Sequence, residues 1–170
     1  MFIPWPAYIW LIFSSVAVAY DFLYIQLRPL TFVDQIHQWK FEPYQVYQFF
    51  DPLKINMEDR FVVIQSWMNA IEVCLILLTI IVSLIPRRKV KFACAVMIIV
   101  LQSMVFWKTV IYLWYDRYFI TVLVERLYSI AVVFYYFTIG PFIIFPLLTI
   151  YYIGKRMLKA IVGEEKRKQE

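Results

Sequence analysis

The sequence has little charge and little glycine. Charged residues make up 17% of the chain, whereas about a quarter is usual for a soluble domain, and only three glycines occur in 170 residues. It has no cluster of metal ligands, glycine-rich phosphate loop, nucleophile elbow or internal repeat. We therefore expect no cofactor and no metal site, and nucleotide, phosphoryl-transfer and hydrolase chemistries have little support. The two cysteines, Cys74 and Cys94, both lie inside apolar stretches, which argues against a disulfide framework.

Long hydrophobic stretches dominate the chain instead. Hydrophobic residues make up 63% of it, against about half in a typical soluble domain. Crossing a bilayer takes about 20 helical residues, and four stretches are long enough: Pro6–Leu27, Phe61–Ile85, Phe92–Tyr115 and Leu127–Ile153. The first reads as an uncleaved span, because no basic residue precedes it and no cleavage site follows it. The sequence therefore predicts an all-α polytopic membrane protein, with one four-helix transmembrane domain over residues 1–160 and a basic tail over 161–170.

The net charge of +5 is gathered in two places. Four basic residues lie between Arg87 and Lys91, and six lie between Lys155 and Lys168. Four spans put both groups on one side of the membrane, and the positive-inside rule makes that side, with both termini, the cytosolic one. The charge is thus explained by topology, and we expect no nucleic-acid partner. Lys166 and Lys168 also match the K-x-K-x-x pattern that returns membrane proteins to the endoplasmic reticulum, although a basic flank with chance spacing is the alternative.

Two opposite charges lie deep inside neighbouring hydrophobic stretches. Glu72 is near the middle of one, and Lys108 is inside the next. An ionised side chain at this depth is costly unless it is paired or hydrated, so it usually faces a protein interior or a cavity. We expect the two residues to form an ion pair at the wall of an intramembrane pocket. Spacing alone does not fix the rotation of each helix, so their contact stays open.

Further polar residues share the faces that carry these charges. Gln65, Asn69 and Glu72 fall at i, i+4 and i+7, so they lie on one face of their helix. Such a stripe can join helices through hydrogen bonds or can line a cavity; three polar groups favour the cavity. Tyr112 and Asp116 follow Lys108 in the third stretch. The resulting candidate pocket residues are Asp21, Gln65, Asn69, Glu72, Lys108, Tyr112 and Asp116.

A set of scattered polar and aromatic positions runs through nearly the whole chain. It includes Tyr20-Asp21, Tyr24, Leu27-Arg28-Pro29, His37, Trp39, Pro43-Tyr44, Tyr47-Gln48, Asp51, Asp59, Phe61, Gln65-Ser66, Asn69, Glu72, Lys108-Thr109-Val110-Ile111-Tyr112, Pro146 and Gly154-Lys155. This set resembles the EXPERA-domain family, which groups emopamil-binding sterol isomerases with sigma-receptor-type sterol-binding proteins of the endoplasmic reticulum. The resemblance implies four spans around a pocket, open toward the bilayer, for a sterol or a cationic amphiphile.

The resemblance also implies a set of proton-transfer residues, most of which this chain lacks. Family isomerases resemble one another in a His-x-x-x-Glu pair on the first span, a Glu on the second and an Asn-x-x-Trp on the last. Asp21 can stand for the first Glu, but the other positions carry Ala17, Ser66, Ile139 and Phe142. Phe142 thereby joins the candidate pocket residues, and no residue is assigned a catalytic role.

Three functions remain open from the sequence. The favoured one is a non-catalytic membrane protein that binds a lipid or sterol, with an accessory subunit of a lipid-handling complex as one form of that role. The second is an isomerase that uses a rearranged set of Asp21, Glu72 and Asp116. The third is a structural or chaperone subunit whose polar stripe only joins helices.

Overall fold

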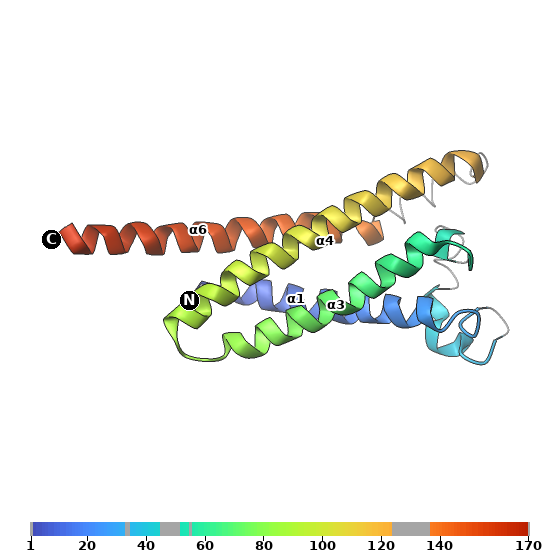
Figure 1. Cartoon of the computed structure of the whole chain (residues 1–170), viewed down its shortest axis with the longest axis horizontal. Helices are drawn as coiled ribbons and strands as arrows, with labels where there is room; N and C mark the ends of the chain where they lie inside the picture. Colours follow the sequence, from blue (N-terminus) through green and yellow to red (C-terminus); the bar gives the residue numbers. More distant parts are fainter. Residues whose placement is uncertain (1, 33–34, 45–51, 55, 124–136, 170) are drawn as a thin grey trace.

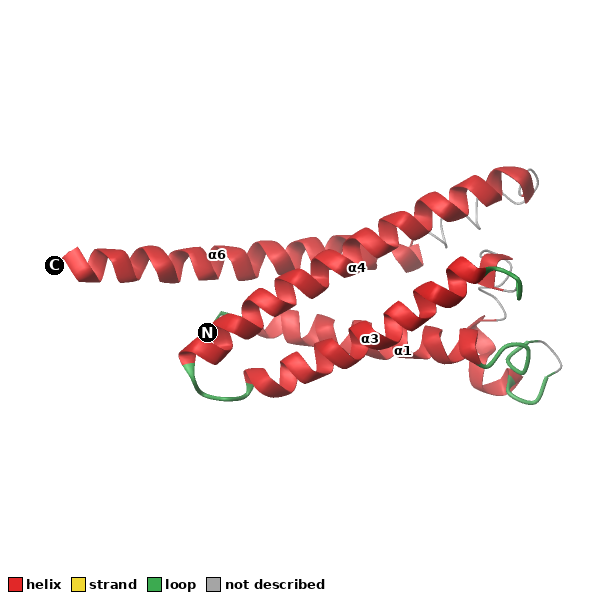
Figure 2. Cartoon of the chain, in the orientation of Figure 1, coloured by secondary structure: helices red, strands yellow, loops and turns green. Residues whose placement is uncertain are grey.

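The computed structural model is mostly helical and has no strand in the part of the chain that it describes. That part covers residues 2–32, 35–44, 52–54, 56–123 and 137–169, without the side chains of 52, 116–123 and 164–169. Its four long helices are α1 (Trp5–Gln26), α3 (Arg60–Ser83), α4 (Arg88–Leu123) and α6 (Pro141–Gln169) (Figures 1 and 2). Four described segments are long and apolar enough to cross a membrane. The predicted all-α, multi-pass membrane fold is confirmed.

Helix boundaries follow local chemistry. Proline occupies the first turn of α1, where its missing N–H leaves no hydrogen bond unmade. The side chain of Asp59 caps α3 by accepting a hydrogen bond of 3.1 Å from the backbone N–H of Val62. The other Asp59 oxygen accepts from the hydroxyl of Tyr115 at 3.1 Å, which ties the start of α3 to α4.

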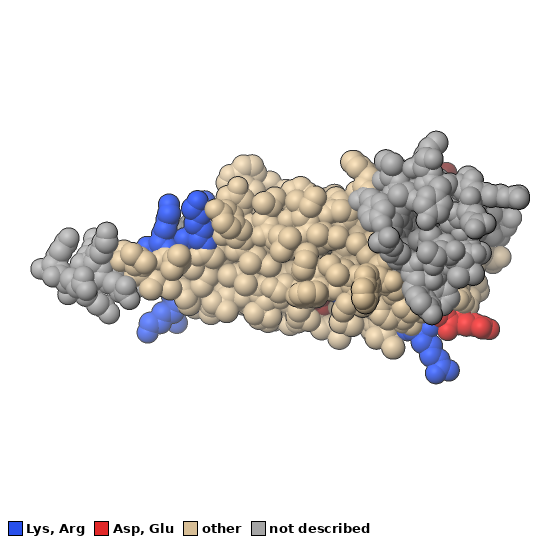
Figure 3. Space-filling view, turned by 90° about the horizontal axis from the view of Figure 1, so that it is seen from above, with Lys and Arg blue, Asp and Glu red and all other residues tan. Residues whose placement is uncertain are grey.

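The helices run alternately up and down, so the molecule has two distinct ends. Figure 1 shows both termini and the short α3–α4 connection at one end, and the long α1–α3 connection at the other. We call these the basic end and the loop end. Lys and Arg side chains gather at the basic end, and a broad band with almost no charge separates it from the loop end (Figure 3). Both termini and the basic residues 87–91 therefore share one end, as the charge pattern predicts. Residues 88–91, which we predict to lie in the connection, form the first turn of α4.

The fourth span differs from its predicted bounds. Its apolar helical part runs over Phe137–Gly163 and continues past the predicted end at Ile153. A turn at Gly140 separates residues 137–139 from α6, because proline at 141 favours the first position of a new helix. The predicted start at Leu127 lies outside the described residues. Residues 161–169, which we predict to form the tail, continue α6.

Packing follows the order of the helices along the chain: α1 lies on α3, α3 on α4 and α4 on α6. A first apolar core includes Leu11, Ile98, Leu101 and Ile153. A second core, at the loop end, packs Phe41 and Leu53 of the α1–α3 connection against the ends of the helices. This second core brings the long connection onto the bundle, where it closes one end of a cavity.

Candidate functional site

A cavity of about 400 Å³ lies in the loop-end half of the bundle. This volume falls within the range of small-molecule sites, about 300–1,000 Å³. The wall is mostly apolar, and it draws on α1, α3, α4, the start of the fourth span and the α1–α3 connection. The lining residues are Ala17, Val18, Tyr20, Asp21, Ile25, Pro43, Tyr44, Lys54, Val62, Gln65, Ser66, Asn69, Val105, Lys108, Thr109, Tyr112, Thr138, Ile139 and Phe142.

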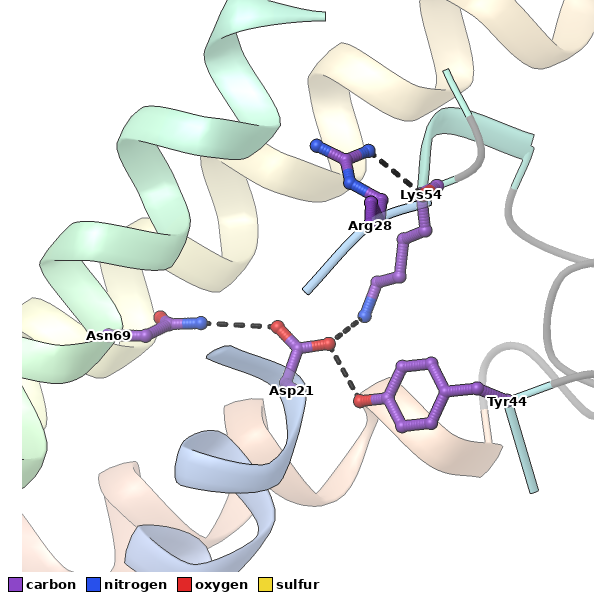
Figure 4. Close-up of polar contacts among 5 residues, drawn as sticks. All are labelled: Asp21, Arg28, Tyr44, Lys54 and Asn69. Atoms are coloured by element: carbon purple, nitrogen blue, oxygen red, sulfur yellow. Dashed lines mark hydrogen bonds and ion pairs between the residues drawn. The ribbon is translucent and has the colours of Figure 1, made fainter. Parts of the chain in front are cut away.

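Asp21 of α1 is the centre of the polar part of this wall (Figure 4). One carboxylate oxygen forms an ion pair with Lys54 and accepts a hydrogen bond of 2.7 Å from the hydroxyl of Tyr44. The other oxygen accepts a hydrogen bond of 3.2 Å from the side-chain amide of Asn69. A buried carboxylate needs such donors to offset its lost hydration. Asp21 thereby joins α1, α3 and the long connection.

The long connection is held over the cavity by contacts with the end of α1. Arg28 donates hydrogen bonds to the backbone oxygens of Lys54 at 2.9 Å and Asn56 at 3.0 Å. Partial burial lowers the pKa of this guanidinium, but an arginine stays protonated at neutral pH. The hydroxyl of Tyr20 donates to the backbone oxygen of Lys40 at 2.6 Å. The rings of Tyr24 and Tyr44 stack with their centroids 4.2 Å apart, so both polar and aromatic contacts fix the long connection.

Glu72 and Lys108 form an ion pair between α3 and α4. Their side chains are only 5% and 11% exposed, so the pair is almost fully removed from solvent. Lys108 lines the cavity, whereas Glu72 lies behind it, near Ser14 and Ser15 of α1. Breaking such a buried pair leaves an uncompensated charge, so the two residues hold α3 and α4 in one relative position.

The structure distributes the predicted pocket residues as follows. Asp21, Gln65, Asn69, Lys108, Tyr112 and Phe142 all line the cavity. The polar stripe on α3 both lines the cavity and joins two helices. Asn69 lines the cavity, and its side-chain amide also donates a hydrogen bond to Asp21 of α1. Asp116 is part of α4, and Lys166 and Lys168 are part of α6, but their side chains are outside the described set.

Sequence reasoning missed the basic partner of Asp21. Lys54 lies in the α1–α3 connection, where neither helical periodicity nor hydropathy indicates the direction of a side chain. Tyr44, the other donor to Asp21 from this connection, is one of the positions that carry the EXPERA resemblance. A signal was available in Asp21 itself, since a carboxylate inside a hydrophobic stretch requires a partner.

The five positions aligned with the isomerase proton-transfer set meet at the same cavity. Ala17 and Asp21 of α1, Ser66 of α3, and Ile139 and Phe142 all line it. Three of these side chains are hydrocarbon and cannot move a proton. The two carboxylates that the structure describes near the cavity, Asp21 and Glu72, are each paired with a lysine. No three His, Cys, Asp or Glu side chains lie close enough to hold a metal ion within the residues that the structure describes.

Compared with known proteins, the chain matches no family model, no curated protein and no solved structure.

Proposed function

We propose that this chain is a membrane protein of the endoplasmic reticulum that binds a sterol or another lipid in the intramembrane cavity and leaves it chemically unchanged. We further propose that it acts as an accessory subunit of a lipid-handling membrane complex. In the membrane, the cytosolic side would be the basic end, which carries both termini.

The observation that carries this proposal is that five positions, aligned with the EXPERA pattern in three different spans, meet at one cavity. Ala17, Asp21, Ser66, Ile139 and Phe142 were aligned with the EXPERA pattern from sequence alone, and they come from three different spans. All five line the cavity. A chance resemblance would scatter them over lipid-facing and core positions, so their convergence supports a family relationship and the sterol or lipid ligand that it implies.

The chemistry of the wall supports binding over catalysis. Isomerisation of a sterol double bond requires one group that adds a proton and another that removes one. Ala17, Ile139 and Phe142 offer neither. An apolar cavity with a small polar region, bordered by a membrane, suits a largely hydrocarbon ligand with one polar group.

The proposal is tested by filling the cavity. The protein is purified in mild detergent without added lipid, and its bound lipids are measured by native mass spectrometry. Ala17→Trp places an indole in the cavity, whereas Val16→Trp places one on the adjacent lipid-facing position, where the side chain is 67% exposed. We expect wild type and Val16→Trp to retain a lipid at one per chain, and Ala17→Trp to lose it. Equal lipid content in all three proteins would contradict binding in this cavity.

A further inference from the structure

The charges around the cavity cancel among themselves. Among the described residues, the charged side chains at the cavity are Asp21, Lys54 and Lys108, and the carboxylate of Glu72 neutralises Lys108 from behind. Each ammonium is thus matched by one carboxylate. An ionised ligand would have to break one of these pairs or remain unpaired in a medium of low dielectric constant, and both are costly. The electrostatics therefore favour an uncharged ligand.

The hydrogen-bonding capacity of the wall is also largely used, with one clear exception. Of the polar side chains that line the cavity in the described residues, Gln65 alone makes no hydrogen bond, ion pair, ring contact or other electrostatic interaction. Its amide oxygen is buried without a partner, and so is the amide oxygen of Asn69, one helical turn along the same face. The others are engaged: Tyr20, Asp21, Tyr44, Lys54, Ser66, Asn69, Lys108, Thr109, Tyr112 and Thr138.

Buried amide oxygens without partners are uncommon in folded proteins and destabilise them. The terminal torsion of a glutamine side chain is broad, so the Gln65 amide can turn toward the cavity at low cost. There it would present both an acceptor and a donor to a bound molecule. Asn69 cannot turn in the same way, because its amide nitrogen already donates to Asp21.

We propose that Gln65, supported by the acceptor oxygen of Asn69, forms the polar end of the ligand site, and that the ligand is an uncharged amphiphile with a hydroxyl group. This inference rests on the proposed function. A hydroxyl both donates and accepts, so it matches the Gln65 amide in either orientation. An ether or ketone can only accept and leaves the amide oxygens unpaired. Ammonium and carboxylate head groups bring a charge for which the cavity has no free partner.

The test uses probes that share a body and differ in one group. Cholesterol and its 3-methyl ether form one set; octadecanol, its methyl ether, octadecylamine and octadecanoic acid form the other. Their affinities for the purified, delipidated full chain are measured by native mass spectrometry. We expect the alcohol of at least one set to bind about fivefold or more tightly than its ether, the ratio that one net hydrogen bond provides. If the preference for the alcohol over its ether appears in the cholesterol set, the ligand is a sterol; if it appears in the octadecanol set, the ligand is a straight-chain lipid.

Two variants assign the effect to Gln65. Gln65→Leu should lower the alcohol-to-ether ratio toward one, with any remaining preference due to the Asn69 oxygen, and it should fold normally because it removes a polar group without a partner. Gln102→Leu makes the same substitution at a buried α4 residue that does not line the cavity. It removes the acceptor of the 2.9 Å hydrogen bond from the Trp10 indole, so it should lower the unfolding free energy but keep the wild-type ratio.

Equal binding of alcohol and ether, tighter binding of the amine or the acid, or an unchanged ratio in Gln65→Leu would overturn this inference and leave lipid binding intact. If no probe binds, the proposed function itself fails.

Discussion

The buried ion pair between Glu72 and Lys108 supports a quantitative prediction. Lys108→Met keeps an unbranched side chain, one heavy atom shorter, and removes its charge, which leaves Glu72 unpaired at a site where its side chain is 5% exposed. Breaking a buried pair in this way costs about 3–5 kcal/mol in soluble proteins. We expect the lower end, about 3 kcal/mol, because helices unfolded in a micelle also find partners for polar groups.

The assay is reversible unfolding of the purified protein in mixed micelles, followed by tryptophan fluorescence. Trp107→Met is the matched control, since the Trp107 side chain is 62% exposed on the neighbouring position of α4 and its replacement should change the unfolding free energy by no more than about 0.5 kcal/mol. The double variant Glu72→Gln/Lys108→Met should recover most of the loss, because neither residue then carries a buried charge. Equal unfolding free energies for Lys108→Met and Trp107→Met would refute the buried pair.

Three further predictions concern the site, the chemistry and the location. Asp21→Asn should lower the unfolding free energy by about 2 kcal/mol, because Lys54 loses its charged partner. It should also make the 35–44 segment more sensitive to protease, because the hydrogen bond from Tyr44 loses its charged acceptor; unchanged cleavage would contradict the role of Asp21 in holding this segment. Expression in yeast that lacks its sterol isomerase should not restore growth, since Ala17, Ile139 and Phe142 cannot transfer protons; rescue would show an active enzyme. Lys166→Ala with Lys168→Ala should move the protein beyond the endoplasmic reticulum in fluorescence images, whereas Arg167→Ala should not; retention of the double variant would exclude the retrieval signal.

Hydropathy and the positions of a few charges predicted the main features of the fold. The free energy of placing a helix in a bilayer depends mainly on composition and length, so four spans could be recognised without knowledge of their packing. Glu72 and Lys108 could be paired in advance because an isolated charge at that depth is so unfavourable. The pairing of side chains within the membrane was thus more predictable than contacts in the connecting segments.

Other features depend on tertiary contacts that a single sequence does not reveal. Lys54 lies in a connection whose path is set by Arg28 and by the stacking of Tyr24 on Tyr44. Hydropathy also placed the end of the fourth span at Ile153, whereas the apolar helix continues to Gly163, because an apolar composition does not show where a helix ends. Similarly, the absence of a hydrogen bond at Gln65 could be found only once the neighbouring side chains were positioned.

The central claim is that the cavity holds a lipid, and a density map of the native protein tests it most directly. The protein would be purified without added ligand, bound to an antibody fragment to increase its mass, and imaged in a lipid nanodisc. We predict continuous elongated density between Ala17 and Phe142, with its polar end beside Gln65. A cavity closed by inward-turned side chains, with no density at these residues, would contradict the account.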